Sequence, residues 1–446
     1  MSLFSGRIFL APAALVSGLF LAATVLAEPI TPNETPAAVP AETEQTELKD
    51  AATAFEDRDF AGALGLLQEA VRKYPQLPPA RVIMAQWFLK TNQLVLARMS
   101  LERAVADSPN DPEAYVWLGK IAMSESRITE ADLLYSKAAS LVPGLTASAE
   151  RKKNVQIQTN DGLAAVAELR GDWPKVQKHL EDWLKLDSSE AIAMQRLARA
   201  LFQQKKVKES LAQLKAAAAI DKNILFPGAR FALFYEQSGD HEAAKTWMDY
   251  AVKKAPNDSR VQLVAANWAL ETGQLPLAQK LADAALKIEP DSLRAMLLRG
   301  MVASFQKDYK TAEFYFQKAH TKSPLDFQAS NNLALALVEQ DDQAKRAKAL
   351  QYAEGNAREY PNVPDAASTY GWVLYKLGRV DEAERVLKHL AAGGNFGPNA
   401  AYYMACVWAH KGKKEVAKKL LESALANKGI FANRKEAETL LKKLGQ

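Results

Sequence analysis

The sequence has a single cysteine, Cys406, among its 446 residues. One thiol excludes an internal disulfide framework and any cysteine-rich zinc or iron–sulfur site. An excess of one charge is also missing: 57 lysines and arginines stand against 52 aspartates and glutamates, a balance too even to predict a nucleic-acid partner. Because 48% of the residues are hydrophobic and 24% are charged, the chain is predicted to fold. The composition fits neither a disordered chain nor a multispanning membrane protein.

Long hydrophobic runs are missing except near the N-terminus. Residues 8–27 carry no charge, Arg7 precedes them, and small residues stand one and three positions before Glu28. This pattern is typical of a secretory signal, so residues 1–27 are predicted to be removed and the mature chain to begin at Glu28. The alternative is a retained anchor, because twenty apolar residues can span a bilayer core of about 30 Å.

The residues after the predicted cleavage site are rich in proline, threonine and glutamate. Residues 28–45 contain Pro29, Pro32, Pro36 and Pro40. Prolines at this density cannot join a helix or a sheet ladder. They predict an extended linker that holds the folded part away from a membrane or a processing site. A frayed terminus is the alternative.

A period of 34 residues runs through the rest of the chain. Prolines that end helical stretches recur at this spacing in two series, Pro75, Pro109 and Pro143, and later Pro256, Pro290 and Pro324. A small residue stands twelve positions before the end of most units, at Ala63, Ala97, Ala131, Ala244, Ala278, Ala312 and Ala349. Apolar residues recur at helical spacing in each half of a unit. Each unit is therefore predicted to be a helix, a tight turn, a second helix and a stop.

One unit carries a nearly complete repeat pattern, with Tyr115, Leu118, Gly119, Ala131, Tyr135, Ala138 and Pro143 in place. Another carries most of it, with Gly300, Ala312, Phe316, Ala319 and Pro324. Over residues 44–431 the sequence resembles the tetratricopeptide repeat family. The resemblance implies an all-α fold, a right-handed superhelical solenoid of about eleven helix-turn-helix repeats with a C-terminal capping helix. In such a fold small residues let helices approach closely, and each unit covers the apolar face of its neighbour.

The repeat frame divides the chain into blocks. We expect repeats 1–3 at residues 46–145, repeats 4–8 at 157–326, repeats 9–11 at 330–431, and the capping helix at 432–446. The frame is interrupted at two places. Residues 144–156 extend a helix or form a joint, and residues 341–348 are predicted to lengthen the turn of the ninth unit.

No catalytic, cofactor-binding or metal-binding residues are predicted. The five histidines occupy different positions of the repeat frame, and no two have the spacing of metal ligands. Cys406 has no neighbouring signature of a nucleophile. Repeats and spacers fill residues 44–431, which leaves no room for a catalytic domain. The chain is predicted not to be an enzyme and to need no cofactor.

The resemblance places a concave groove along the first helices of the repeats. The positions that line this groove in the family hold Lys120, Arg199, Asn267, Met301 and Leu335 here. A groove of mixed polarity suits an extended peptide or a partner helix. A protein is therefore the expected partner, and nucleic acid is not.

Three aromatic residues are candidates for a binding platform near the C-terminus. Trp372 and Tyr375 share one face of a first helix, and Tyr402 lies on the corresponding face of the next unit. On this hypothesis, replacing Trp372 and Tyr375 by alanine weakens partner capture by an order of magnitude and leaves the melting temperature nearly unchanged. The alternative is that Trp372 packs between units, in which case its loss lowers the melting temperature.

The stretch YGWVLYKLGRVDEA at 370–383 and the closing FANRKEAETLLKKL are similar to the C-terminal repeats of secreted bacterial tetratricopeptide repeat proteins. Those proteins are linked to exopolysaccharide export and PEP-CTERM systems. The resemblance implies an exported, periplasmic or secreted scaffold that helps assemble a cell-envelope or surface-polymer complex. The alternatives are a membrane-anchored assembly factor that keeps residues 8–27 and a regulatory subunit of an envelope enzyme. A membrane is a partner only if the signal is retained.

Overall fold

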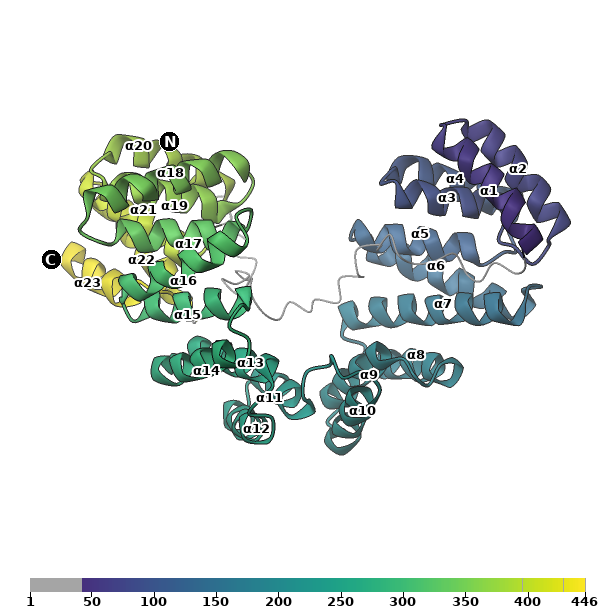
Figure 1. Ribbon diagram of the computed structural model, residues 1–446, viewed down its shortest axis with the longest axis horizontal. Coiled ribbons are helices and arrows are strands. Elements are labelled where there is room, and N and C mark those ends of the chain that lie inside the picture. The colour runs from purple at the N-terminus through teal and green to yellow at the C-terminus, as the bar shows by residue number, and fades with distance from the viewer. Residues whose placement is uncertain (1–41, 395, 428, 446) are drawn as a thin grey trace, which may run out of the picture. The chain divides into compact units, whose positions relative to one another are not determined.

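The computed structural model describes residues 42–394, 396–427 and 429–445. These residues form 23 α-helices and one short 3-10 turn, with no β-strand among them (Figure 1). The predicted all-α fold class is confirmed. The described chain divides into two units, with the boundary between Gly239 and Asp240. The predicted signal peptide, residues 1–27, and residues 28–41 of the predicted linker lie outside the described residues.

The N-terminal unit consists of helix pairs followed by one further helix. Its helices are α1 (Glu42–Glu56), α2 (Phe60–Lys73), α3 (Ala80–Lys90), α4 (Leu94–Asp107), α5 (Glu113–Ser124), α6 (Ile128–Leu141), α7 (Ala149–Arg170), α8 (Trp173–Leu186), α9 (Ala191–Gln203), α10 (Val207–Ile220) and α11 (Pro227–Gln237). From α1 to α10, each first helix packs against the second helix of its own pair, and that second helix packs against the next first helix.

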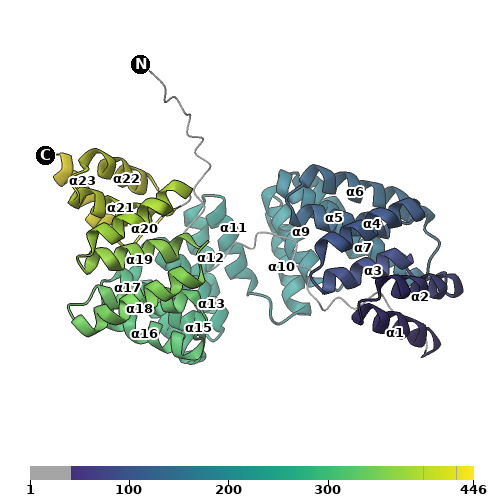
Figure 2. The same cartoon turned by 90° about the horizontal axis from the view of Figure 1, so that it is seen from above.

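The C-terminal unit continues the pattern and ends in an unpaired helix. Its helices are α12 (His241–Lys254), α13 (Ser259–Glu271), α14 (Leu275–Ile288), α15 (Leu293–Phe305), α16 (Tyr309–Lys322), α17 (Phe327–Val338), α18 (Gln343–Glu359), α19 (Pro364–Lys376), α20 (Val380–Gly393), α21 (Pro398–His410), α22 (Lys414–Ala426) and α23 (Arg434–Gly445). Figure 2 shows the first helices of this unit following one another from α15 through α17 and α19 to α21. The capping helix α23 packs against α22.

The small residues of the repeat frame lie where helices touch. All seven alanines that stand twelve positions before a stop are fully buried. Glycines serve the same purpose opposite large rings: a Cβ atom added to Gly300 would lie 2.6 Å from the ring of Phe316. Phe316 is itself 1% exposed. Because a methyl group at this distance overlaps the ring, the close approach of α15 and α16 depends on the missing side chain.

The turn inside nearly every pair uses a left-handed residue at one repeated position. These residues are Arg58, Asn92, Ser126, Gly171, Lys205, Gly239, Gly273, Lys307, Gly378 and Gly412, with φ between 58° and 82°. The turn between α17 and α18 is the exception among the described residues. The three extra residues of that repeat were expected to lengthen the turn, but they lengthen helix α18 to 17 residues. The carboxylate of Asp342 accepts from the backbone N–H of Lys345 at 3.0 Å, and this cap starts the helix at once.

Two other boundaries differ from the expected blocks. Helix α7 starts at Ala149, eight residues before the predicted fourth repeat, because the Ser148 hydroxyl caps it by accepting from the N–H of Arg151 at 3.1 Å. Residues 149–156 therefore extend a helix, which is one of the two expected alternatives. Helix α1 starts at Glu42, inside the predicted linker. Among the described residues, no helix is long and apolar enough to cross a bilayer.

Candidate binding site in the groove of the C-terminal unit

Three of the residues predicted to line a groove meet at one cavity in the C-terminal unit. Asn267 on α13, Met301 on α15 and Leu335 on α17 all line a cavity of about 160 Å³. Each is 34 residues from the next, so the repeat places them on the same face of successive first helices. A cavity of about 150 Å³ holds a molecule the size of benzene, whereas pockets for drug-sized ligands measure about 300–1,000 Å³. The site has the size of one side chain.

The cavity combines an apolar wall with many hydrogen-bonding groups. Its apolar residues are Leu270, Met301, Phe305, Phe316, Leu335, Ala336, Ile430 and Ala432. Its polar residues are Asn267, Glu271, Ser304, Lys307, Tyr309, Asn332, Glu339, Asn399, Tyr403 and Asn433. Four asparagines among them supply both donors and acceptors, which suits the N–H and C=O groups of a peptide.

The two lining carboxylates stand one helical turn after predicted groove residues. Glu271 follows Asn267 by four residues and accepts a hydrogen bond from its Nδ2 at 2.9 Å. Glu339 follows Leu335 by four residues and accepts from the Trp372 indole Nε1 at 2.8 Å. It also pairs with the Lys376 ammonium at 2.9 Å. Residues four apart lie on one helix face, so the carboxylates extend the predicted stripe.

A segment from the C-terminal end of the chain closes one side of the cavity. We call residues Ile430–Asn433 the strap. The Lys307 ammonium, in the turn after α15, donates to the Ala432 carbonyl at 2.8 Å and pairs with Glu436 at 2.9 Å. Arg434 holds the loop before α23 by donating to the carbonyls of Leu425 and Gly429 at 3.2 and 2.9 Å. The cap predicted at 432–446 thus also reaches across the groove, which its sequence does not indicate.

Two tyrosines of the cavity report a negative surrounding. Burial is the largest cause that raises the pKa of Tyr309, and the charges of Glu339 and Glu436 raise it further. Burial also raises the pKa of Tyr403, again with a contribution from Glu339. Both hydroxyls stay protonated at neutral pH and can donate as well as accept hydrogen bonds.

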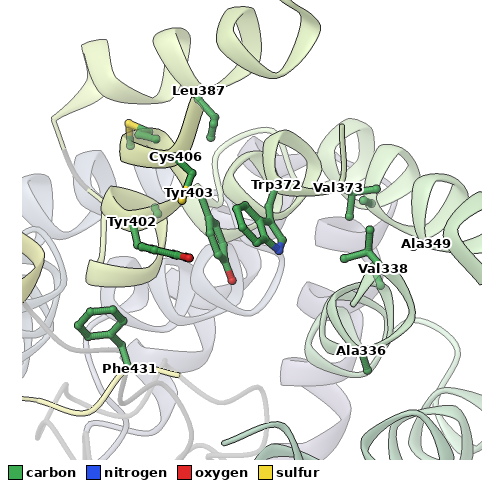
Figure 3. Close-up of a cluster of buried hydrophobic side chains, with 14 of the residues drawn as sticks. Ala336, Val338, Ala349, Trp372, Val373, Leu387, Tyr402, Tyr403, Cys406 and Phe431 are labelled. Carbon is green, nitrogen blue, oxygen red and sulfur yellow. The ribbon is translucent and has the colours of Figure 1, made fainter. Parts of the chain in front are cut away.

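The predicted aromatic platform forms a buried stack behind the cavity. Trp372 is 5% exposed and Tyr402 is 8% exposed. The Trp372 ring stacks on Tyr403 of α21 with centroids 4.5 Å apart, and on Tyr375 at 5.5 Å. Figure 3 shows the rings of Trp372, Tyr403 and Tyr402 side by side. Trp372 thus packs between two units, which is the second of the two arrangements considered above. A role of these residues in binding stays a prediction.

The other two predicted groove residues belong to the N-terminal unit. The Lys120 ammonium lies 4.3 Å from the centroid of the Trp117 ring on the same helix, α5. The Arg199 guanidinium of α9 lies 5.7 Å from the centroid of Trp173 on α8. Neither lines the cavity described above. Both show long basic side chains laid over aromatic faces, an arrangement that covers apolar surface and keeps the charge.

The described residues offer little to nucleophilic or metal chemistry. They contain no group of three or more histidine, cysteine, aspartate or glutamate side chains that could hold a metal ion. Burial raises the pKa of the Cys406 thiol to about 11. This thiol therefore stays protonated at neutral pH, and the thiolate is the reactive form. The cavity is suited to binding.

These features define the chain as a helical-repeat protein. Residues 54–115, in the N-terminal unit, match a family model described as tetratricopeptide repeat. Residues 263–324, in the C-terminal unit and including Asn267 and Met301, match a second model with the same description. The two matches support the tetratricopeptide repeat family for this chain. A scaffold of this kind indicates protein–protein interaction, and proteins built from this repeat are generally non-enzymatic.

Solved structures with related folds are distant in sequence. A tetratricopeptide repeat protein from Parabacteroides merdae is 13% identical, with 65% of this chain and 99% of that protein covered and a TM-score of 0.39. Yeast Tom70 is 13% identical, with 90% of this chain and 96% of that protein covered and a TM-score of 0.38. The tetratricopeptide repeat protein TTC0263 from Thermus thermophilus is 18% identical, with 42% and 98% covered and a TM-score of 0.37. Among curated proteins, no significant match is found.

Proposed function

We propose that this protein is an exported, non-enzymatic scaffold that helps assemble a cell-envelope or surface-polymer complex. It binds an extended peptide or a helix of its partner in the groove formed by the first helices of its repeats. The observation that carries the binding part of the proposal is the meeting of Asn267, Met301 and Leu335 at one cavity. Export rests on the charge-free residues 8–27 and the small residues before Glu28.

The chemistry of the cavity supports a peptide as the bound group. An extended peptide presents N–H and C=O groups that form no hydrogen bonds within the peptide. The asparagine side chains at 267, 332, 399 and 433 can pair with either kind of group. Apolar side chains between them provide burial, so main-chain pairing and side-chain packing can occur together.

The competing proposal is a membrane-anchored assembly factor, in which residues 8–27 are kept. An intact mass of the protein purified from cells separates the two: a chain that starts at Glu28 supports export, and a chain that retains residues 8–27 supports the anchor. A regulatory subunit of an envelope enzyme uses the same groove and differs only in the partner.

Site-specific photocrosslinking tests the groove. A benzoylphenylalanine residue at Met301, or at Leu335 as a second position, is expected to form a discrete adduct with a partner protein in cells, because both side chains face the cavity. Phe314 on α16 is the matched control, since it is an aromatic side chain of the same unit that does not line the cavity and is 52% exposed.

The comparison between positions decides the result. Adducts at positions 301 and 335 but not at 314 support the groove as the binding surface. Adducts of equal yield at all three positions, or at position 314 alone, contradict it.

A further inference from the structure

The cavity contains more hydrogen-bond acceptors than a neutral occupant would satisfy. Its wall carries two carboxylates, Glu271 and Glu339, and one ammonium, Lys307. That ammonium already pairs with Glu436 at 2.9 Å and donates to the strap at Ala432. The other nearby cation, Lys376, pairs with Glu339. The lysines of the site are thus engaged with the protein's own oxygens.

An asparagine at the cavity adds to the acceptor side. The Oδ1 atom of Asn399, which lines the cavity, is buried and has no hydrogen-bond partner. A buried acceptor without a donor is costly, and a ligand that supplies the donor recovers this loss. The same cost applies to a carboxylate whose water is displaced by an apolar ligand. Anionic and purely apolar occupants are therefore both disfavoured.

The apolar part of the wall sets a second condition. Leu270, Met301, Phe305 and Leu335 line the same 160 Å³ as the acceptors. A suitable occupant therefore has an apolar stem and a cationic, donor-rich end. Lysine and arginine side chains have this construction: they bury their methylene groups against apolar surface and keep a charged head with several donors.

We propose that this cavity is a specificity pocket for one lysine or arginine side chain of the partner peptide. The proposal rests on the proposed function, since it requires that a peptide lie in the groove. The main chain of the peptide pairs with the asparagines, and the basic side chain enters beside the strap, with its charge facing Glu271 and Glu339.

The test starts from a library of short random peptides displayed on phage and selected on the purified chain. Enrichment of peptides that share one lysine or arginine position is the expected result. A selected peptide is then synthesised with lysine at that position and, separately, with norleucine, which keeps the stem and removes the ammonium. We expect norleucine to weaken binding about tenfold or more, the loss typical of a hydrogen-bonded charge.

Variants of the protein assign the effect to this pocket. In Glu271→Gln the preference for lysine over norleucine is expected to shrink several-fold. Glu422→Gln, on the exposed side of α22, is the matched control and is expected to retain the full preference. Glu339 is not used because it also holds Trp372 and Lys376. Circular dichroism confirms that both variants keep their helical content.

The outcomes separate the two proposals. If peptides are enriched without a shared basic position, or if norleucine binds as well as lysine, the pocket proposal is overturned and groove binding stands. If Glu271→Gln leaves the preference intact, the basic residue binds elsewhere and the pocket proposal is again overturned. If no peptide is enriched, both proposals are overturned.

Discussion

Replacing Trp372 by alanine is expected to lower the free energy of unfolding of the C-terminal unit by about 3–5 kcal/mol, the usual cost of deleting a buried tryptophan side chain. The ring is 5% exposed, stacks on Tyr403 at 4.5 Å and donates to Glu339 at 2.8 Å. Its removal leaves a cavity between α19 and α21 and a carboxylate with one donor fewer. Urea denaturation followed by circular dichroism measures the change.

Two further variants separate the contributions to this loss. Trp372→Phe keeps an aromatic ring and removes the indole N–H, so we expect it to cost about 1–3 kcal/mol. Phe314→Ala removes an aromatic side chain that is 52% exposed, and we expect a change within about 0.5 kcal/mol. An unchanged denaturation midpoint in Trp372→Ala would restore the hypothesis of an open platform. The burial of Trp372 replaces the sequence-based expectation of an unchanged melting temperature.

Replacing Arg151 by alanine is expected to destabilise the N-terminal unit by about 3–5 kcal/mol, because it breaks a buried ion pair on one side only. Arg151 of α7 is 5% exposed, and its guanidinium donates to Asp111 at 2.7 Å and to Glu113 at 3.0 Å. Glu113 is equally buried, so it would keep its charge without the cation that balances it. Arg72→Ala breaks an ion pair with Glu69 that is about three-quarters exposed, and we expect it to cost less than about 1 kcal/mol.

The loss in Arg151→Ala should depend on pH. Burial raises the pKa of Glu113 in the folded protein, and the charge of Arg151 opposes this increase. Without Arg151 the folded pKa rises further above the unfolded value of about 4.3. Between these two values the folded state binds more protons than the unfolded state, so its stability falls as the pH rises through this range.

We therefore expect the deficit of Arg151→Ala against the unmodified chain to be smallest near about pH 4 and larger at about pH 7.5. Adding Glu113→Gln should recover part of the loss at the higher pH, because it removes the unbalanced charge. A deficit that is the same at both pH values would show that lost packing, and not the charge of Glu113, causes it.

The repeat spacing predicts more of this molecule than any single motif does. A 34-residue interval brings a helix face back to the same place in the next pair, so Asn267, Met301 and Leu335 could be placed together before any coordinates were available. The same rule indicates Glu271 and Glu339, one helical turn further on. Neither was proposed, because acidic residues on an exposed helix face are common.

Other features of the site lie beyond a periodic pattern. The contact between Lys307 and Ala432 joins residues 125 apart in the sequence, and no repeat interval relates them. Periodicity also gives the face of a helix and not the depth of a side chain. Trp372 is on the predicted face, but Tyr403 and Glu339 cover it. At residues 341–348 the extra length was located correctly, and the cap at Asp342 determines that it enters the helix.

Hydrogen exchange with a bound peptide or crosslinked partner tests the central claim most directly, since it reports on every repeat at once. We expect binding to slow amide exchange in α13, α15 and α17 and in the strap, Ile430–Asn433, where the cavity lies. The second helices α14, α16 and α18 should change little and serve as internal controls. Slower exchange confined to these second helices, or to the N-terminal unit alone, would contradict a binding site in the groove of the C-terminal unit.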